Sequence, residues 1–276
     1  MAFQTWQVGL DIQNGQICAL AIQRRRNGWQ LRHWWRHALP HDTLTNGLVQ
    51  RPEPVIALLQ HWRRQLPYRL SLRVGFPPQL VLQRLVELPG TQLREPERSN
   101  YITAAARRFF PIEPETLALD YRAAEGNNGQ LWLTAARHEA VQSWQHCFRQ
   151  AKLQPDIFEL TPAALRALAQ GLQLNPASAL VHRLTDHWLW FPAGQQTGWC
   201  AVEEAPDFAA LRCRYLPDTT DFYYSSAVDT DLPDNTKRLN PLDAFAFKQL
   251  PLPLSTSEFA LAAGLALRPG DSDGLG

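Results

Sequence analysis

Residues 8–22 of the chain read VGLDIQNGQICALAI, two apolar runs joined by a short polar segment. Asn14 and Gly15 lie in that segment, and both residue types tolerate the positive φ that a tight turn requires. The stretch therefore predicts a β-hairpin. Asp11 comes near the end of its first strand, just before the turn, which makes Asp11 the first candidate functional residue.

The composition is that of an ordinary globular protein, with 276 residues, 45% of them hydrophobic and 19% charged. This length is enough for a sizeable core and for two domains. The net charge is only +1 but it is uneven: residues 1–138 hold 17 Lys/Arg and 10 Asp/Glu, whereas residues 139–276 hold 10 and 16. A basic half suggests contact with something anionic, although charge alone is weak support.

The four cysteines are far apart and form no Cys-x-x-Cys pair, which argues against a zinc site or a redox motif. The N-terminus enters a predicted strand directly, without the basic and apolar regions of a signal peptide. The longest late apolar run, residues 259–267, is too short to span a bilayer. We therefore expect a cytoplasmic protein whose membrane association depends on a partner or a surface patch.

The order of predicted elements suggests a repeated architecture. A third strand (28–38) follows the hairpin, and then come a helix (54–66) and a strand (70–76). Residues 79–153 change to a small α+β unit. After a strand and a helix at residues 156–171, three more strands fall within residues 180–202. They repeat the N-terminal three-strand pattern, which indicates an internal duplication.

Several stretches, taken in this order, resemble the PilM family of actin-like type IV pilus assembly proteins. The resemblance is carried by residues 8–12 (VGLDI), 84–89 (RLVELP), 104–112 (AAARRFFPI), 118–121 (ALDY), 133–139 (LTAARHE) and 259–267 (FALAAGLAL). It covers residues 7–175 well and is patchy afterwards. No single motif decides it, because their order along the chain carries the weight.

The resemblance implies an α/β, actin-like (ribonuclease-H-like) fold of two domains. Residues 1–78 and 154–175 would form the first actin-like subdomain, and residues 79–153 an inserted α+β subdomain. Residues 176–268 would form a truncated second domain, and residues 269–276 a disordered tail rich in Gly, Asp and Ser.

An actin-type ATP site needs two glycine-containing phosphate turns and a Gly-Gly adenosine turn, because backbone N–H groups must approach the ligand closely. Here residues 13–17 (QNGQI) keep one Gly and no Lys, residues 181–186 (VHRLTD) have no Gly, and residues 225–228 read SSAV. We therefore expect a pseudo-ATPase without a cofactor, with weak ATP and Mg²⁺ binding as the open alternative. Asp11, Asn14, Gly15 and Asp186 are its expected remnants.

The resemblance also implies a partner. A cleft between the first subdomain and the insert would receive the N-terminal cytoplasmic segment of a PilN-like inner-membrane protein. Arg107, Phe109, Phe110 and Trp132 are the candidate walls of this cleft. The chain would then be a non-catalytic adaptor, peripheral to the inner membrane. It would link the membrane platform to a cytoplasmic motor ATPase and serve pilus-like assembly or the use of external DNA.

Two other functions stay open at this stage. One is an active actin-like ATPase. The other is direct DNA binding or contact with anionic headgroups through residues 24–26 (RRR) and the neighbouring aromatic and basic residues. A basic hairpin turn with core-facing tryptophans explains that pattern better, so direct DNA binding is not expected. His182, Asp186 and His187 could be imagined as metal ligands, but an intervening turn separates them, and no metal site is predicted.

Overall fold

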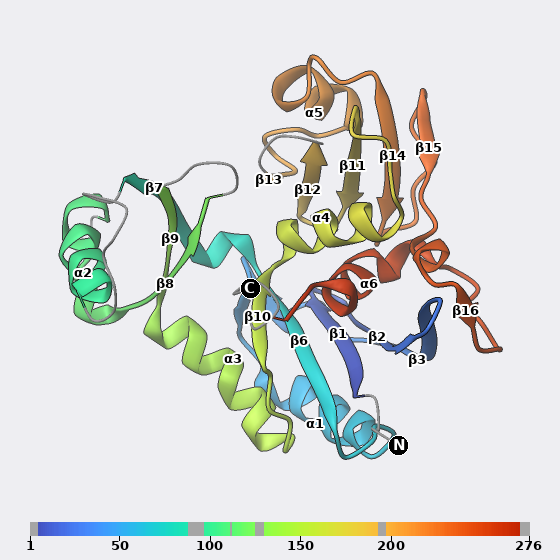
Figure 1. Cartoon of the computed structure of the whole chain (residues 1–276), viewed down its shortest axis with the longest axis horizontal. Helices are drawn as coiled ribbons and strands as arrows, with labels where there is room; N and C mark the ends of the chain where they lie inside the picture. Colours follow the sequence, from blue (N-terminus) through green and yellow to red (C-terminus); the bar gives the residue numbers. More distant parts are fainter. Residues whose placement is uncertain (1–4, 88–96, 111, 125–129, 193–196, 271–276) are drawn as a thin grey trace.

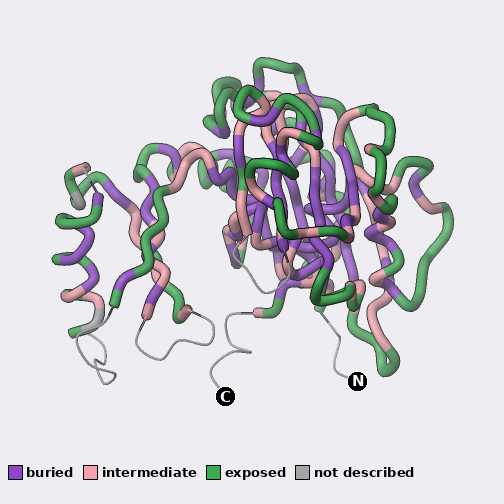
Figure 2. Tube along the Cα trace, turned by 90° about the horizontal axis from the view of Figure 1, so that it is seen from above, coloured by how far each residue is buried: buried purple, intermediate pink, exposed green. Residues whose placement is uncertain are grey.

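The computed structural model describes residues 5–87, 97–110, 112–124, 130–192 and 197–270 (Figure 1). Two large β-sheets lie one above the other in this view, with helices between them, and a small sheet projects to one side. Figure 2 shows buried residues gathered where the large sheets and those helices meet. Within the described ranges, no helix has both the length and the apolar character needed to cross a bilayer.

The first sheet contains the opening hairpin. Its strand order is β10 (Ile157–Leu160), β6 (Leu70–Phe76), β1 (Trp6–Gln13), β2 (Gln16–Arg25), β3 (Gly28–Ala38) and β16 (Phe247–Lys248). Strands β1, β2 and β3 form an antiparallel meander, whereas β6 pairs parallel with β1 and β10 parallel with β6. Val8, Leu10 and Ile12 point into the core that this sheet shares with helix α1 (Pro52–Arg63).

The second sheet repeats this pattern. Its order is β13 (Gly198–Ala201), β12 (His187–Pro192), β11 (Ser178–Arg183), β14 (Asp221–Ser226) and β15 (Thr236–Arg238). An antiparallel meander is again followed by two parallel strands. The structure therefore contains the predicted duplication, and the predicted actin-like α/β class is confirmed.

Helices α4 (Thr161–Gly171) and α6 (Ala260–Leu267) pack between the two sheets. Gly9 and Gly264 allow this packing. A Cβ on Gly9 would lie 2.0 Å from the carbonyl oxygen of Ala262, and a Cβ on Gly264 would lie 2.0 Å from that of Ala164. Both contacts are with backbone atoms, which cannot rotate away as a side chain can. Helix α6 is thus locked against β1 on one side and α4 on the other.

The inserted unit has the strand order β7 (Val81–Glu87), β9 (Gln130–Arg137) and β8 (Leu117–Ala123). Helix α2 (Glu97–Phe109) covers one face and shares a small core with it, which includes Ile102, Ala106 and Leu133. Helix α3 (His138–Gln150) does not belong to this core. Its Trp144 and Phe148 are buried in the first-sheet core, so the predicted insert boundary at residue 153 moves back to about residue 137.

The remaining elements are short. They are β4 (Leu44–Thr45), β5 (Leu48–Val49), α5 (Phe208–Tyr215), and four 3-10 turns: η1 (Pro78–Leu80), η2 (Pro114–Thr116), η3 (Pro241–Ala244) and η4 (Ser257–Phe259). Of the tail predicted at residues 269–276, residues 271–276 lie outside the described part of the chain.

Candidate functional site

The first predicted phosphate turn joins β1 to β2. Asp11 lies near its start and is only 1% exposed, and Gly15 takes the left-handed φ of +97° that the turn requires. Burial raises the pKa of Asp11 from 3.8 to about 7, although a hydrogen bond donated by the Gln13 side-chain amide opposes this rise. A carboxyl group with such a pKa is largely neutral in mildly acidic solution.

The second predicted turn joins β11 to β12 and faces the first. Its Asp186 lies 2.6 Å, Oδ1 to Nδ1, from His187. Burial pushes the pKa of Asp186 up, but the hydrogen bond and charge of His187 outweigh burial and leave that pKa below its usual value. The same Nδ1 lies 3.0 Å from Nε2 of Gln79, which belongs to η1. This contact joins η1, which follows strand β6 of the first sheet, to β12 of the second sheet.

The space left between the two turns is small, with a volume of about 40 Å³. At roughly 10–15 Å³ for each water, it holds only about three water molecules. Asp11, Asn14 and Asp186 all line it, so the structure does bring three of the predicted remnants together. Leu44, Pro77 and other bulky side chains fill the rest of its wall.

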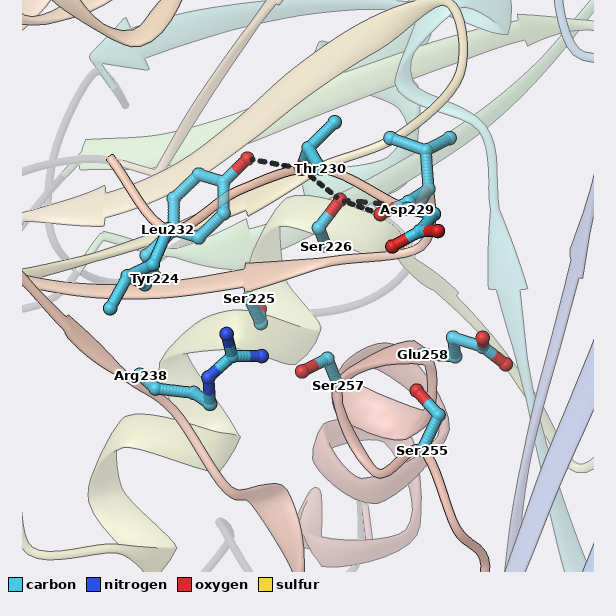
Figure 3. A pocket seen from close by; sticks show the side chains of 11 residues that line it. Tyr224, Ser225, Ser226, Asp229, Thr230, Leu232, Arg238, Ser255, Ser257 and Glu258 are labelled. Atoms are coloured by element: carbon cyan, nitrogen blue, oxygen red, sulfur yellow. Dashed lines mark hydrogen bonds between the residues drawn. The ribbon is translucent and has the colours of Figure 1, made fainter.

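A larger cavity of about 330 Å³ lies beside this cleft, at the end of β14 (Figure 3). Its wall includes residues 225 and 226, the start of the predicted adenosine turn. Tyr224, Thr230 and Ser226 are joined there by hydrogen bonds of 3.3 and 3.4 Å between their hydroxyl groups. In Figure 3 the Arg238 guanidinium points toward Ser225 and Ser257. Asp229 and Glu258 also line this cavity, so it is polar and suits a hydroxyl-bearing ligand.

A buried histidine supports the floor of this cavity. His182 is fully buried on β11, and its Nδ1 lies 2.7 Å from Oγ of Ser225. Burial lowers the pKa of His182 to about 3, with a further contribution from the charge of His187, so its ring is neutral. Among the described residues, no group of three or more His, Cys, Asp and Glu side chains gathers in a way that could hold a metal ion.

The four residues predicted to wall a partner cleft do not come together. Phe110 is buried in the insert core under α2, while Arg107 and Phe109 are exposed on that helix. Arg107 pairs with Glu115 at 2.6 Å. Trp132 lies on β9, where its neighbours Leu131 and Leu133 point toward α2, so Trp132 points to the opposite face of the sheet. The prediction of one shared wall is therefore wrong.

That opposite face has its own row of side chains. Strand pairing places Leu85 of β7 and Arg122 of β8 directly beside Trp132. Leu85 is 41% exposed and Trp132 is partly exposed, because α2 covers only the other face of the sheet. We call Leu85, Trp132 and Arg122 the open face. The period-two alternation of apolar residues 131, 133 and 135 could have shown that Trp132 belongs to it.

An ionic junction connects the open face to the body of the protein. Glu159 on the edge strand β10 is 5% exposed and accepts hydrogen bonds from Arg122 at 2.7 Å and from Arg268 at 2.6 Å. Arg268 directly follows α6 and is itself buried. The junction therefore ties the insert to the helix that lies beneath the cleft. These three residues come from distant parts of the chain, and no sequence motif marks them.

Comparison with known proteins now places the chain. The family model described as "Type IV pilus assembly protein PilM" matches residues 9–181, more than half of the sequence. The chain belongs to the PilM family of type IV pilus assembly proteins. It is 27% identical over 272 residues to the DNA utilization protein HofM of Escherichia coli strain K12, covering 97% of this chain and 98% of that protein.

Solved structures of similar fold agree with this assignment. The PilM–PilN type IV pilus biogenesis complex contains a chain that superposes with a TM-score of 0.65 at 18% identity, covering 94% of this chain and 97% of that one. The cytoplasmic domain of EpsL, an inner-membrane component of the type II secretion system of Vibrio cholerae, superposes with a TM-score of 0.56 at 10% identity, covering 94% of each chain. At these identities the likeness concerns the fold alone.

Proposed function

We propose that this PilM-family protein is a non-catalytic adaptor that binds the N-terminal cytoplasmic segment of a PilN-like inner-membrane protein. It would hold that partner beside a cytoplasmic motor ATPase, in a pilus-like apparatus that supports the use of external DNA. In this role it is cytoplasmic and reaches the inner membrane through the partner. Membership of the PilM family, the likeness to the DNA utilization protein HofM and the likeness in fold to a chain of a PilM–PilN complex support this proposal.

The observation that carries the proposal is the open face of the insert. Trp132 supplies a large, partly exposed aromatic surface, and Leu85 adds an apolar neighbour in the same row. Tryptophan is the residue type most enriched where interfaces concentrate their binding energy. Strands β7 and β8 are the outer strands of the described three-stranded sheet, so their free backbone groups can pair with an extended segment.

The cleft between the two large domains supports the non-catalytic part of the proposal. A space of about 40 Å³ is small for a triphosphate, and no Lys or Arg is among the residues that line it. Asp11 is buried in the wall of this space, and burial raises its pKa to about 7. Hydrolysis would therefore need the cleft to open and Asp11 to ionise. We infer that the fold serves here to present surfaces for partner binding, and not to hydrolyse a nucleotide in the cleft.

A titration of the purified chain with a synthetic peptide tests this function. The peptide is the N-terminal cytoplasmic segment of the PilN-like protein from the same organism. Trp132→Ala should weaken binding by roughly tenfold or more, which is the usual cost of removing a central aromatic side chain. Phe109→Ala is the matched control, because that aromatic residue is exposed on α2, away from the open face. Undetectable binding of the wild-type chain, or an equal loss in both variants, would contradict the proposal.

A further inference from the structure

The end of β2 and the start of the turn to β3 carry three consecutive arginines, and an exposed apolar segment runs beside them. We propose that Arg24, Arg25, Arg26, Phe247 and Leu250 form a contact surface for an anionic lipid bilayer. We call this set the edge patch. It lies at the edge of the first sheet formed by β3 and β16, whereas the insert projects from the opposite side of the molecule (Figure 1).

The segment that bears Phe247 and Leu250 follows the outer edge of β3. A Cβ on Gly28 would lie 2.9 Å from Cβ of Ala246, which places the segment next to the arginine turn. Phe247 then pairs with Gln30 as part of β16. Further along, the carbonyl oxygen of Pro251 accepts a hydrogen bond of 2.7 Å from the indole N–H of Trp34. Cationic and apolar parts of the patch are therefore neighbours at one edge.

The apolar side chains of this segment are held outward. Phe247 is 44% exposed and Leu250 is 79% exposed. Leu252 packs against the core and Pro253 is buried, so the backbone next to Leu250 is anchored while its side chain faces solvent. Large apolar side chains that a fold anchors in exposed positions are typical of surfaces that meet a partner or a membrane.

The arginines keep their charge available. Arg24 lies over the Trp29 ring, 5.0 Å from its centroid, and Arg25 donates to Gln30 at 2.7 Å, so both heads are positioned by neutral groups. None of the ion pairs identified among the described residues involves residues 24–26. The nearby Lys248 is paired with Asp243 at 2.8 Å and is not counted in the patch. Unpaired cations beside exposed apolar groups fit anionic headgroups over an apolar layer.

The aromatic residues of this region favour a bilayer over a nucleic acid. Single-stranded nucleic acids need exposed aromatic faces on which their bases can stack. Trp29 and Trp34 are instead partly buried against the core between the sheets, and Trp34 also meets Phe259 edge-on at 5.9 Å. The exposed apolar groups, Phe247 and Leu250, are of the kind that enter the headgroup region of a membrane.

Co-sedimentation with lipid vesicles tests the proposal. The full chain is mixed with vesicles of phosphatidylcholine alone, or of phosphatidylcholine with phosphatidylglycerol. We expect pelleting with the anionic vesicles, weakening as salt rises. The triple variant Arg24→Gln, Arg25→Gln, Arg26→Gln should reduce the bound fraction roughly tenfold or more, since each basic residue near the surface contributes separately. Leu250→Ser should reduce it by a smaller factor.

The matched control is Arg107→Gln with Arg108→Gln, which removes two exposed arginines from α2 on the insert. All these side chains lie on the surface, and circular dichroism checks that each variant is folded. No pelleting of the wild-type chain, equal binding to both vesicle types, or equal loss in the control variant would overturn the proposal. Binding of a single-stranded oligonucleotide without binding of anionic vesicles would overturn it as well.

Discussion

The cleft between the two large domains and the open face of the insert differ in almost every physical respect. The cleft is lined by polar and apolar side chains, of which Asp11 and Thr161 are buried polar ones, has a volume of about 40 Å³, and is crossed by the contact between Gln79 and His187. The open face presents Trp132 and Leu85 at one side of a sheet that α2 covers only on the other. Little space remains between the two turns of the cleft, whereas the open face is exposed on a peripheral sheet.

This difference shows that a fold and its original site can be separated. The hairpins, the glycines and α6 that build the cleft are needed to pack the two sheets, so they stay whether or not a ligand binds between them. The small three-stranded sheet contributes little to that central packing. Its surface is therefore free to meet a partner, and this is why we assign the binding role to the insert.

The largest expected effect tests how tightly α6 packs against α4. Gly264→Ala should destabilise the protein by more than about 4 kcal/mol, because the new Cβ would meet the backbone carbonyl of Ala164. Gly171→Ala is the control. Its Cβ would approach the Leu267 side chain at 2.7 Å, and that side chain can move. Denaturant unfolding measures the stability of both variants. Similar stabilities would show that α6 is not closely packed against α4.

The next largest loss of stability is expected at the ionic junction, which attaches the insert to the body of the protein. Glu159→Gln should cost about 3 kcal/mol or more, because it removes the buried negative charge that Arg122 and Arg268 both contact. Asp120→Asn is the control, since that carboxylate is exposed and 3.9 Å from Arg122, and it should change the stability by less than about 1 kcal/mol. The urea concentration at the unfolding midpoint is compared between the two variants. Equal midpoints would mean that the junction does not hold the insert.

The pH dependence of stability tests the buried carboxyl in the cleft. The pKa of Asp11 is about 7 in the folded chain, and we take its ordinary value of 3.8 for the unfolded chain. Between these values the folded state keeps a proton that the unfolded state has lost, so this group makes the protein less stable as the pH rises toward 7. From pH 5 to pH 8, the wild-type chain should lose about 2–3 kcal/mol relative to Asp11→Asn. Parallel curves would show that Asp11 is already ionised in the folded chain.

The smallest effect concerns the contact across the cleft mouth. Gln79→Ala removes the side chain that meets His187 and should cost about 1 kcal/mol. Gln83→Ala removes an exposed hydrogen bond to Thr134 within the insert and should cost less than Gln79→Ala. If Gln83→Ala lowers the midpoint temperature of thermal unfolding more than Gln79→Ala does, the contact between Gln79 and His187 does not hold the domains together.

Much of the fold could be predicted because its signals are local. The alternating apolar residues 8–12 and 17–22, with the turn residues between them, define the hairpin by themselves. The three-strand pattern returns near residue 180 and reveals the duplication. Helix α3 was misassigned because an amphipathic helix shows that it has a buried face but not which core receives Trp144 and Phe148.

The sites were harder to predict, since they depend on contacts between distant residues. The missing glycines marked the altered turns, but the closure by Gln79 and His187 joins positions 108 residues apart. The same holds for Glu159, which meets Arg122 and Arg268 from two other elements. The resemblance offers Phe110 and Trp132 alike as walls of the partner cleft. The placement of α2 shows that Phe110 is core, and Trp132 faces the other side of the sheet, as the alternation of its apolar neighbours indicates.

We infer that partner binding is independent of the cleft. Titration of the PilN-like peptide into the chain, with and without saturating Mg-ATP, tests this independence. We expect the peptide to bind with the same affinity in both conditions. A peptide that binds only with Mg-ATP, or with clearly altered affinity, would show that the cleft still accepts nucleotide and controls the partner site.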